Sequence, residues 1–121
     1  MLLVDDSPLF LEQASAWLSR ESDIEVVGCV TSGAAALALA ERLKPRVVLM
    51  DVAMPGMNGI EATRRLKSLP KPPAVLMLTL DGDPGYRAAA AAAGAEGFVC
   101  KSDLATALLP SLRRVSREVP E

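Results

Sequence analysis

Five side chains that could take part in chemistry follow short apolar segments of the chain. They comprise three carboxylates, one hydroxyl and one amine, namely Asp5, Asp6, Asp51, Thr79 and Lys101. The 121 residues include no histidine, which excludes Ser/His and Cys/His nucleophilic pairs, metal sites with histidine ligands and a phosphohistidine carried by this chain. Any chemistry must therefore come from carboxylates, hydroxyls, lysine or arginine.

The elements that must position these side chains alternate along the sequence. Helical periodicity follows each of five apolar runs, which predict strands over residues 2–4, 24–30, 47–50, 74–78 and 97–100. Capping residues and prolines predict that the helices begin at Ser7-Pro8, just after residues 31–33, at Asn58, at Asp83-Pro84 and at Asp103. Five such units predict an α/β, flavodoxin-like (βα)5 fold, with a parallel sheet of order 2-1-3-4-5 and helices on both faces.

Two of the predicted helices have unusual compositions. Six consecutive alanines, residues 88–93, predict a fourth helix that packs closely on the sheet. Pro110 lies in the last helix, which should reach about Arg117, and is expected to kink that helix or delay its start. With only one Trp, one Tyr and two Phe, the core should consist of Val, Leu, Met and Ala.

The predicted topology brings the five reactive side chains to one edge of the sheet, where such folds bind ligands. A single Asp after a strand is usually a cap or a turn residue, but the complete set is far more specific. Three neighbouring carboxylates repel one another unless a cation lies among them, and oxygen ligands without histidine favour Mg²⁺. With Thr79 and Lys101 around one carboxylate, the set would form a cradle for a phosphoryl group.

Four segments resemble the receiver domain of two-component response regulators. They are residues 3–7 (LVDDS), 49–59 (LMDVAMPGMNG), 78–79 (LT) and 97–101 (GFVCK). The resemblance covers the whole chain and implies a receiver domain over residues 1–117 with a polar tail at 118–121. It also implies that Asp51 accepts a phosphoryl group from a phosphohistidine of a sensor histidine kinase, in a reaction that depends on Mg²⁺.

The same resemblance implies a role for each neighbour of Asp51. Asp6, Asp51 and the backbone carbonyl of Ala53 would bind Mg²⁺, while Asp5 would act mainly through water. Thr79 and Lys101 would contact the phosphoryl oxygens. Phe98 would rotate inward when Thr79 moves toward the phosphate, so these two residues would form the switch.

The predicted partners follow partly from the resemblance and partly from composition. Residues 81–87 and 101–104 look most like receivers attached to helix-turn-helix (LuxR-type) transcription outputs, although no DNA-binding segment is expected within this chain. The resemblance implies that kinase recognition would use the first helix and the loop after the fifth strand, a surface that includes Leu9, Leu11 and Gln13. A homodimer would use the fourth helix, fifth strand and fifth helix. Arg113, Arg114 and Arg117 are better explained as a solvated helix end than as a phosphate-binding patch, although this cluster is also a candidate for the dimer surface.

Charge and cysteine content indicate the environment of the protein. Thirteen basic and fifteen acidic residues do not suggest direct nucleic-acid binding. No apolar run of membrane-spanning length occurs. Cys29 and Cys100 are predicted on opposite edge strands, too far apart for a disulfide, which suits a reducing cytoplasm. Cys100 is expected to be a small buried residue rather than a redox site.

Three positions depart from the family pattern. Leu80 is bulky where a small residue is usual, and should narrow access to Asp51. Ala53 has no side chain to position a hydrolytic water. Ser102 stands where many receivers have proline, which puts a cis peptide in doubt. Together these departures predict slow loss of the phosphoryl group.

Two alternatives use the same residues. A Mg²⁺-dependent phosphohydrolase would form the same aspartyl phosphate, but such enzymes usually carry a second Asp two residues after the nucleophile, where this chain has Ala53. A degenerate receiver would signal without phosphate, which the complete acidic set with Thr79 and Lys101 argues against. We therefore expect a switch that performs at most self-phosphorylation and slow self-dephosphorylation, and that is not a turnover enzyme.

Overall fold

Five parallel strands form one sheet in the order β2-β1-β3-β4-β5, as the sequence predicts. The structure, a computed structural model, describes residues 1–80 and 84–118. The register pairs Val4 with Met50, Asp51 with Leu78 and Thr79 with Cys100, so the carboxyl ends of the central strands lie level with one another. The strands are β1 (Leu2–Val4), β2 (Gly28–Val30), β3 (Val47–Asp51), β4 (Ala74–Thr79) and β5 (Gly97–Cys100).

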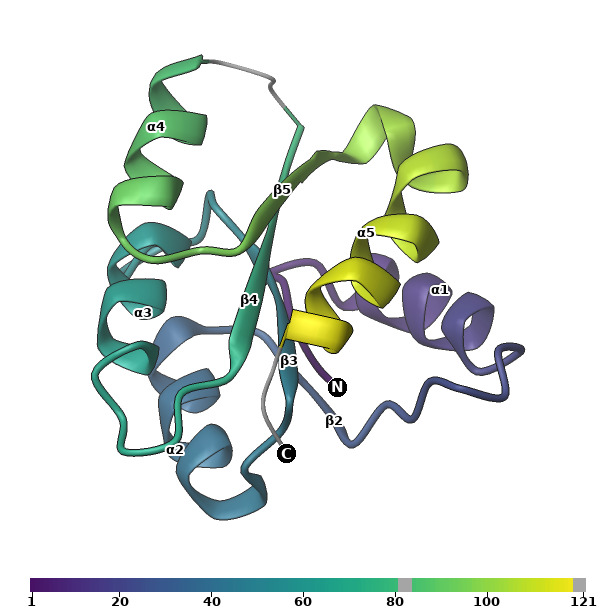
Figure 1. Cartoon of the computed structure of the whole chain (residues 1–121), viewed down its shortest axis with the longest axis horizontal. Coiled ribbons are helices and arrows are strands. Elements are labelled where there is room, and N and C mark those ends of the chain that lie inside the picture. The colour runs from purple at the N-terminus through teal and green to yellow at the C-terminus, as the bar shows by residue number, and fades with distance from the viewer. Residues whose placement is uncertain (81–83, 119–121) are drawn as a thin grey trace.

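Helices cover both faces of this sheet. Figure 1 shows α2, α3 and α4 on one face and α1 and α5 on the other. A short 3-10 turn, η1 (Lys101–Asp103), joins β5 to α5. Within the described part of the chain, no helix is both long and apolar enough to cross a membrane. The helices are α1 (Pro8–Leu18), α2 (Gly33–Leu43), α3 (Gly59–Leu66), α4 (Pro84–Ala92) and α5 (Leu104–Glu118).

The three central strands, β1, β3 and β4, bury both of their faces, which explains their almost wholly apolar sequences. Every residue of β3 and β4 is buried. Successive side chains of a strand point to opposite faces, so Leu2 and Val4 join the core beneath α2, α3 and α4, whereas Leu3 joins the core beneath α1 and α5. A rigid sheet therefore sets the positions of the residues at its carboxyl edge.

Strand β2 is shorter than the residues 24–30 predicted from the apolar pattern. It spans only Gly28–Val30, because its neighbour β1 begins at Leu2 and offers no earlier partner residues. One further hydrogen bond, from the Val27 N–H to the Met1 carbonyl at 2.9 Å, extends the contact by a single step. The short first strand predicted from sequence, residues 2–4, was the signal that could have shortened the second strand.

Helix α4 packs less closely than its alanines suggested. Only Ala90 within α4 is buried, together with Ala93 just beyond it, whereas Ala88, Ala91 and Ala92 are exposed. A helix on the surface of a sheet buries one stripe, and alanines elsewhere on its circumference remain in solvent. The predicted start at Asp83 lies outside the described residues.

Helix α5 begins without delay, which corrects one of the expectations for Pro110. The helix starts at Leu104 and continues past Pro110, whose side chain is exposed, as far as Glu118. The helix thus extends one residue beyond the predicted domain boundary. Residues 119–121 of the predicted tail lie outside the described part of the chain.

Candidate functional site

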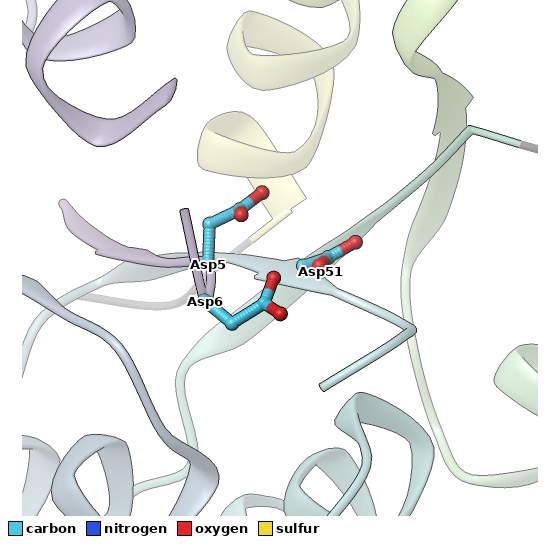
Figure 2. Close-up of side chains that lie close together, drawn as sticks. All are labelled: Asp5, Asp6 and Asp51. Carbon is cyan, nitrogen blue, oxygen red and sulfur yellow. The ribbon is translucent and has the colours of Figure 1, made fainter. Parts of the chain in front are cut away.

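Three carboxylates gather at the carboxyl ends of β1 and β3, as predicted (Figure 2). Asp5 and Asp6 follow β1 directly, and Asp51 is the last residue of β3. One oxygen from each of the three lies within 4.8 Å of the others. Asp5 and Asp51 are buried and Asp6 is exposed, so the cluster opens to solvent on the Asp6 side. Oxygen donors at this spacing suit a hard divalent cation.

The first turn of α1 leaves the Asp6 carboxylate available to the cluster. Ser7 caps this helix, because its side chain accepts a hydrogen bond from the Phe10 N–H at 3.2 Å. Asp5 supports the same turn through Oδ1, which accepts the Ser7 N–H at 2.9 Å. Asp6 is therefore not the helix cap, which was the alternative role for an Asp at this position.

A close contact between α3 and the end of β3 shapes the loop that carries Ala53. A Cβ atom added to Gly59 would lie 1.9 Å from the Asp51 carbonyl oxygen, so only glycine fits. The Gly59 N–H donates to the Val52 carbonyl at 2.9 Å. Asn58 then caps α3 by accepting the Glu61 N–H at 2.9 Å, as its spacing predicted. The Gly59 contacts and the Asn58 cap thereby hold the loop between β3 and α3 against the end of β3.

Burial and neighbouring charge act strongly on Asp51. The pKa of the Asp51 carboxyl is raised to about 6, first by burial and then by the nearby carboxylates of Asp5 and Asp6. The Lys101 ammonium and a backbone hydrogen bond from Ala53 act in the opposite direction. The ionised Asp51 carboxylate is therefore short of positive charge, and a cation in the cluster would relieve this.

Lys101 makes its shortest ionic contact with Asp5. Its ammonium lies 2.6 Å from Asp5 Oδ2 and 3.7 Å from Asp51 Oδ1. The lysine side chain is 13% exposed and that of Asp5 only 1%. The sequence analysis placed Asp5 and Lys101 at one edge but assigned no direct contact between them. Their pairing gives Asp5 a structural partner in addition to its predicted action through water.

The predicted switch residues lie on β4 and β5, the two strands that follow β3 in the sheet. Thr79 ends β4 and is buried, while Phe98 on β5 is partly buried and pairs with Met77 of the sheet. The Arg87 guanidinium of α4 lies 4.9 Å from the centroid of the Phe98 ring. Phe98 thus connects the sheet to the sparsely packed α4. Its rotation during switching stays a prediction.

The three departures from the family pattern also lie near the cluster. The Leu80 side chain is 83% exposed, so it is not packed over Asp51. Ala53 is exposed as well. Ser102 lies in η1, and the described residues contain no cis peptide bond. An effect of Leu80 on access to Asp51 remains a prediction.

Two of the three residues named for the predicted kinase surface are exposed, and the surface itself stays a prediction. Leu9 is 63% exposed and Gln13 is also exposed, but Leu11 is buried and cannot contact a kinase. The positions of Leu11, Ala14 and Leu18 follow an apolar helical stripe, which is the signal that could have identified Leu11 as a core residue.

Intramolecular contacts account for Arg113 and separate the two cysteines. Arg113 bonds to Glu21 at 2.8 Å and to Asp23 at 3.0 Å, which ties α5 to the segment after α1. Cys29 and Cys100 are free and lie on the two edge strands, as predicted. Cys100 is only partly buried, contrary to expectation, because β5 forms the edge of the sheet.

Comparisons with known proteins agree with the fold. The response regulator VraR of Staphylococcus aureus is 40% identical over 119 residues, which cover 97% of this chain and 56% of VraR. The chain thus spans about half the length of the curated relatives it matches. The receiver domain of the Mycobacterium tuberculosis response regulator NarL is 33% identical, with a TM-score of 0.89 and coverage of 96% of this chain and 94% of that domain.

A second solved structure resembles the whole sheet and its helices. The response regulator domain of Thermotoga maritima CheB is 29% identical, with a TM-score of 0.90 and coverage of 98% of this chain and 96% of that one. The family described as the response regulator receiver domain matches residues 1–112. This chain therefore belongs to the response regulator receiver domain family.

Proposed function

We propose that this receiver domain is a phosphorylation-dependent switch in which Asp51 accepts a phosphoryl group from a phosphohistidine of a sensor histidine kinase. An oxygen of the Asp51 carboxylate forms a bond to phosphorus while the bond between phosphorus and the imidazole nitrogen breaks, and the imidazole keeps the electron pair. The observation that best supports this role is the buried Asp51 carboxylate close to two other carboxylates, with the Lys101 ammonium 3.7 Å away.

A magnesium ion fits the same residues. Asp6, Asp51 and the backbone carbonyl of Ala53 would hold it, and Asp5 would act mainly through water. This assignment rests on the all-oxygen donor set and on the spacing of the carboxylate oxygens, which lie within 4.8 Å of one another. When bound, Mg²⁺ would offset the negative charge of the carboxylates and of the phosphoryl oxygens.

Thr79 and Lys101 would contact the phosphoryl group on Asp51 and respond to its presence. Lys101 needs only a short movement from Asp5 to reach a phosphoryl group on Asp51, because it already lies close to both. Thr79 would donate its hydroxyl, and Phe98 would rotate inward as Thr79 moves. The surface of α4, β5 and α5 would then change, which could favour a homodimer or control an output domain.

The proposal also includes control of transcription as the output of the switch. VraR is a response regulator, and a LuxR-family regulator from Aurantimonas is 29% identical with a TM-score of 0.92. By analogy, the phosphorylated domain would control a DNA-binding partner or domain and would not itself contact DNA. Such an output rests on the relatives and not on the geometry of the site.

Labelling with a small phosphodonor tests the central step without a kinase. With Mg²⁺ and acetyl phosphate, the wild-type chain should gain one phosphoryl group, which intact-mass spectrometry detects. Asp51→Asn should gain none, and removal of Mg²⁺ with EDTA should prevent labelling of the wild type. Asp23→Asn is the matched control, because this exposed aspartate lies outside the cluster and pairs with Arg113. Labelling of Asp51→Asn would refute the proposal.

Turnover is not expected beyond slow self-dephosphorylation. Ala53 lies two residues after Asp51 and has only a methyl group, so it cannot serve as the acid or base of a phosphohydrolase. A steady-state phosphatase assay should therefore show no more phosphate release than decay of Asp51 phosphate accounts for. Sustained release from a phosphomonoester would favour the phosphohydrolase alternative.

A further inference from the structure

We propose that Phe10 is a positioning residue for phosphoryl transfer, because its ring holds the Lys101 ammonium beside the two buried aspartates. The Lys101 nitrogen lies 4.3 Å from the centroid of the Phe10 ring, well inside the range of a cation–π contact. This inference rests on the proposed function of Asp51 and adds to it a residue from α1 that bears no reactive group.

Three groups surround the Lys101 ammonium, and they differ in charge. Asp5 Oδ2 is 2.6 Å away and Asp51 Oδ1 is 3.7 Å away, while the Phe10 ring lies at 4.3 Å. The lysine side chain is only 13% exposed. The ring therefore supplies one wall of a site in which little water reaches the ammonium.

An aromatic wall differs from a third carboxylate in a way that matters for the reaction. The face of the ring attracts the cation through its quadrupole but offers neither a formal charge nor a hydrogen-bond acceptor. It can stabilise the partly dehydrated ammonium without binding it in competition with Asp51. Lys101 is then free to turn from Asp5 toward new negative charge on Asp51 and still keep its contact with the ring.

The backbone holds the ring in place through the same turn that carries Asp5. Asp5 accepts the Ser7 N–H at 2.9 Å, and the Ser7 hydroxyl accepts the Phe10 N–H at 3.2 Å. The carboxylate and the ring that contact Lys101 are thus linked by two consecutive hydrogen bonds. Since Phe10 also packs against the core beneath α1 and α5, the ring is held from both sides.

Fluorination of the Phe10 ring separates its quadrupole from its size. Site-specific replacement of Phe10 by 4-fluoro-, 3,5-difluoro- and pentafluorophenylalanine should weaken the attraction in steps while the shape changes little. The initial rate of Asp51 labelling by acetyl phosphate with Mg²⁺ should fall in the same order, by roughly threefold to tenfold at the last step. Phe10→Leu should show a similar loss, whereas Phe10→Trp should stay within about twofold of the wild type.

A double-mutant cycle shows whether the effect acts through Lys101. In Lys101→Met, whose residual rate is lower, pentafluorophenylalanine at position 10 should have no further effect. Trp17→Leu is the matched control on α1, since it also replaces a partly buried aromatic residue by leucine, and its labelling rate should be unchanged.

Each outcome decides the proposal. Unchanged labelling of the fluorinated proteins, or an equal loss in the Lys101→Met background, would overturn the role of Phe10 while the wild-type labelling leaves the function of Asp51 intact. A wild-type chain that takes no phosphoryl group would instead refute both.

Discussion

The ionic cluster at the carboxyl edge of the sheet differs in its balance of charge from the ion pair between Lys67 and Glu96. At the edge, Lys101 faces Asp5 and Asp51, and Asp6 adds a third carboxylate to the group. Elsewhere Lys67 pairs with Glu96 at 2.6 Å, and the pair is only partly buried. A surplus of buried negative charge opposes folding, so it points to a ligand, whereas a matched pair needs only a structural explanation.

Both side chains of the Lys67–Glu96 pair also form hydrogen bonds with the backbone. Glu96 accepts the Val75 N–H at 2.8 Å with its second oxygen, and Lys67 donates to the Pro73 carbonyl at 2.9 Å. These bonds join the end of α3 to the start of β4 and to the segment just before β5. The one positive charge of this pair matches its one negative charge. The substitutions described below test this difference from the carboxylate cluster.

Loss of the single cation from the carboxylate cluster should have the largest effect. Lys101→Met leaves Asp5, which is 1% exposed, buried without its ionic partner, and should lower the free energy of unfolding by about 3 kcal/mol at pH 8 without Mg²⁺. Urea unfolding followed by circular dichroism measures this. Lys67→Met is the matched control and should lose about 1 kcal/mol. Equal losses in the two variants would remove the distinction between the regions.

Removal of one negative charge from the cluster should stabilise the metal-free protein, which is opposite to the effect of removing the Lys101 charge. Asp51→Asn should raise the free energy of unfolding of the metal-free protein at pH 8 by about 2 kcal/mol, because a buried carboxylate with a raised pKa opposes folding when ionised. The folded state holds the Asp51 proton up to about pH 6, whereas the unfolded chain releases it near pH 4. The contribution of Asp51 to wild-type stability should therefore be most favourable below this interval and should fall as pH rises through it.

The pH dependence supplies the control for this prediction. At pH 4 the wild type and Asp51→Asn should differ little, since Asp51 is then protonated in the folded wild type. Mg²⁺ at pH 8 should stabilise the wild type and have much less effect on the variant. A variant that is less stable than the wild type at pH 8 without Mg²⁺ would show that Asp51 is already neutralised by its neighbours.

The gathering of the site residues could be predicted from the sequence, because parallel strands bring their carboxyl ends to one edge of the sheet. That rule alone placed Asp51, Thr79 and Lys101 together. It could not show that Lys101 lies nearer to Asp5 than to Asp51, since a long flexible side chain can reach either carboxylate. Leu11 was misassigned for a different reason: the prediction took it as part of the first-helix surface, although its helical spacing with Ala14 and Leu18 places it on the buried apolar stripe of α1.

The balanced pair should respond weakly and independently of the site. Glu96→Gln retains an oxygen for the Val75 N–H but removes the charge opposite Lys67, and should cost about 1 kcal/mol of unfolding free energy. The loss should be the same with and without Mg²⁺ and should not alter labelling by acetyl phosphate. Dependence of the loss on Mg²⁺ would link this distant pair to the carboxylate cluster and weaken the division between them.

The smallest effect is expected at the uncharged rim of the cluster. Leu80 follows Thr79 directly and is 83% exposed, so Leu80→Ala should leave stability almost unchanged. If its bulk narrows the approach of water to Asp51 phosphate, decay of the phosphorylated protein should accelerate by about twofold to threefold, equivalent to well under 1 kcal/mol of barrier. The measurement is loss of the added mass over time after removal of acetyl phosphate, with Leu9→Ala on the exposed side of α1 as control. An unchanged decay would mean that the lifetime of the phosphoryl group is set within the charged cluster and not at its rim.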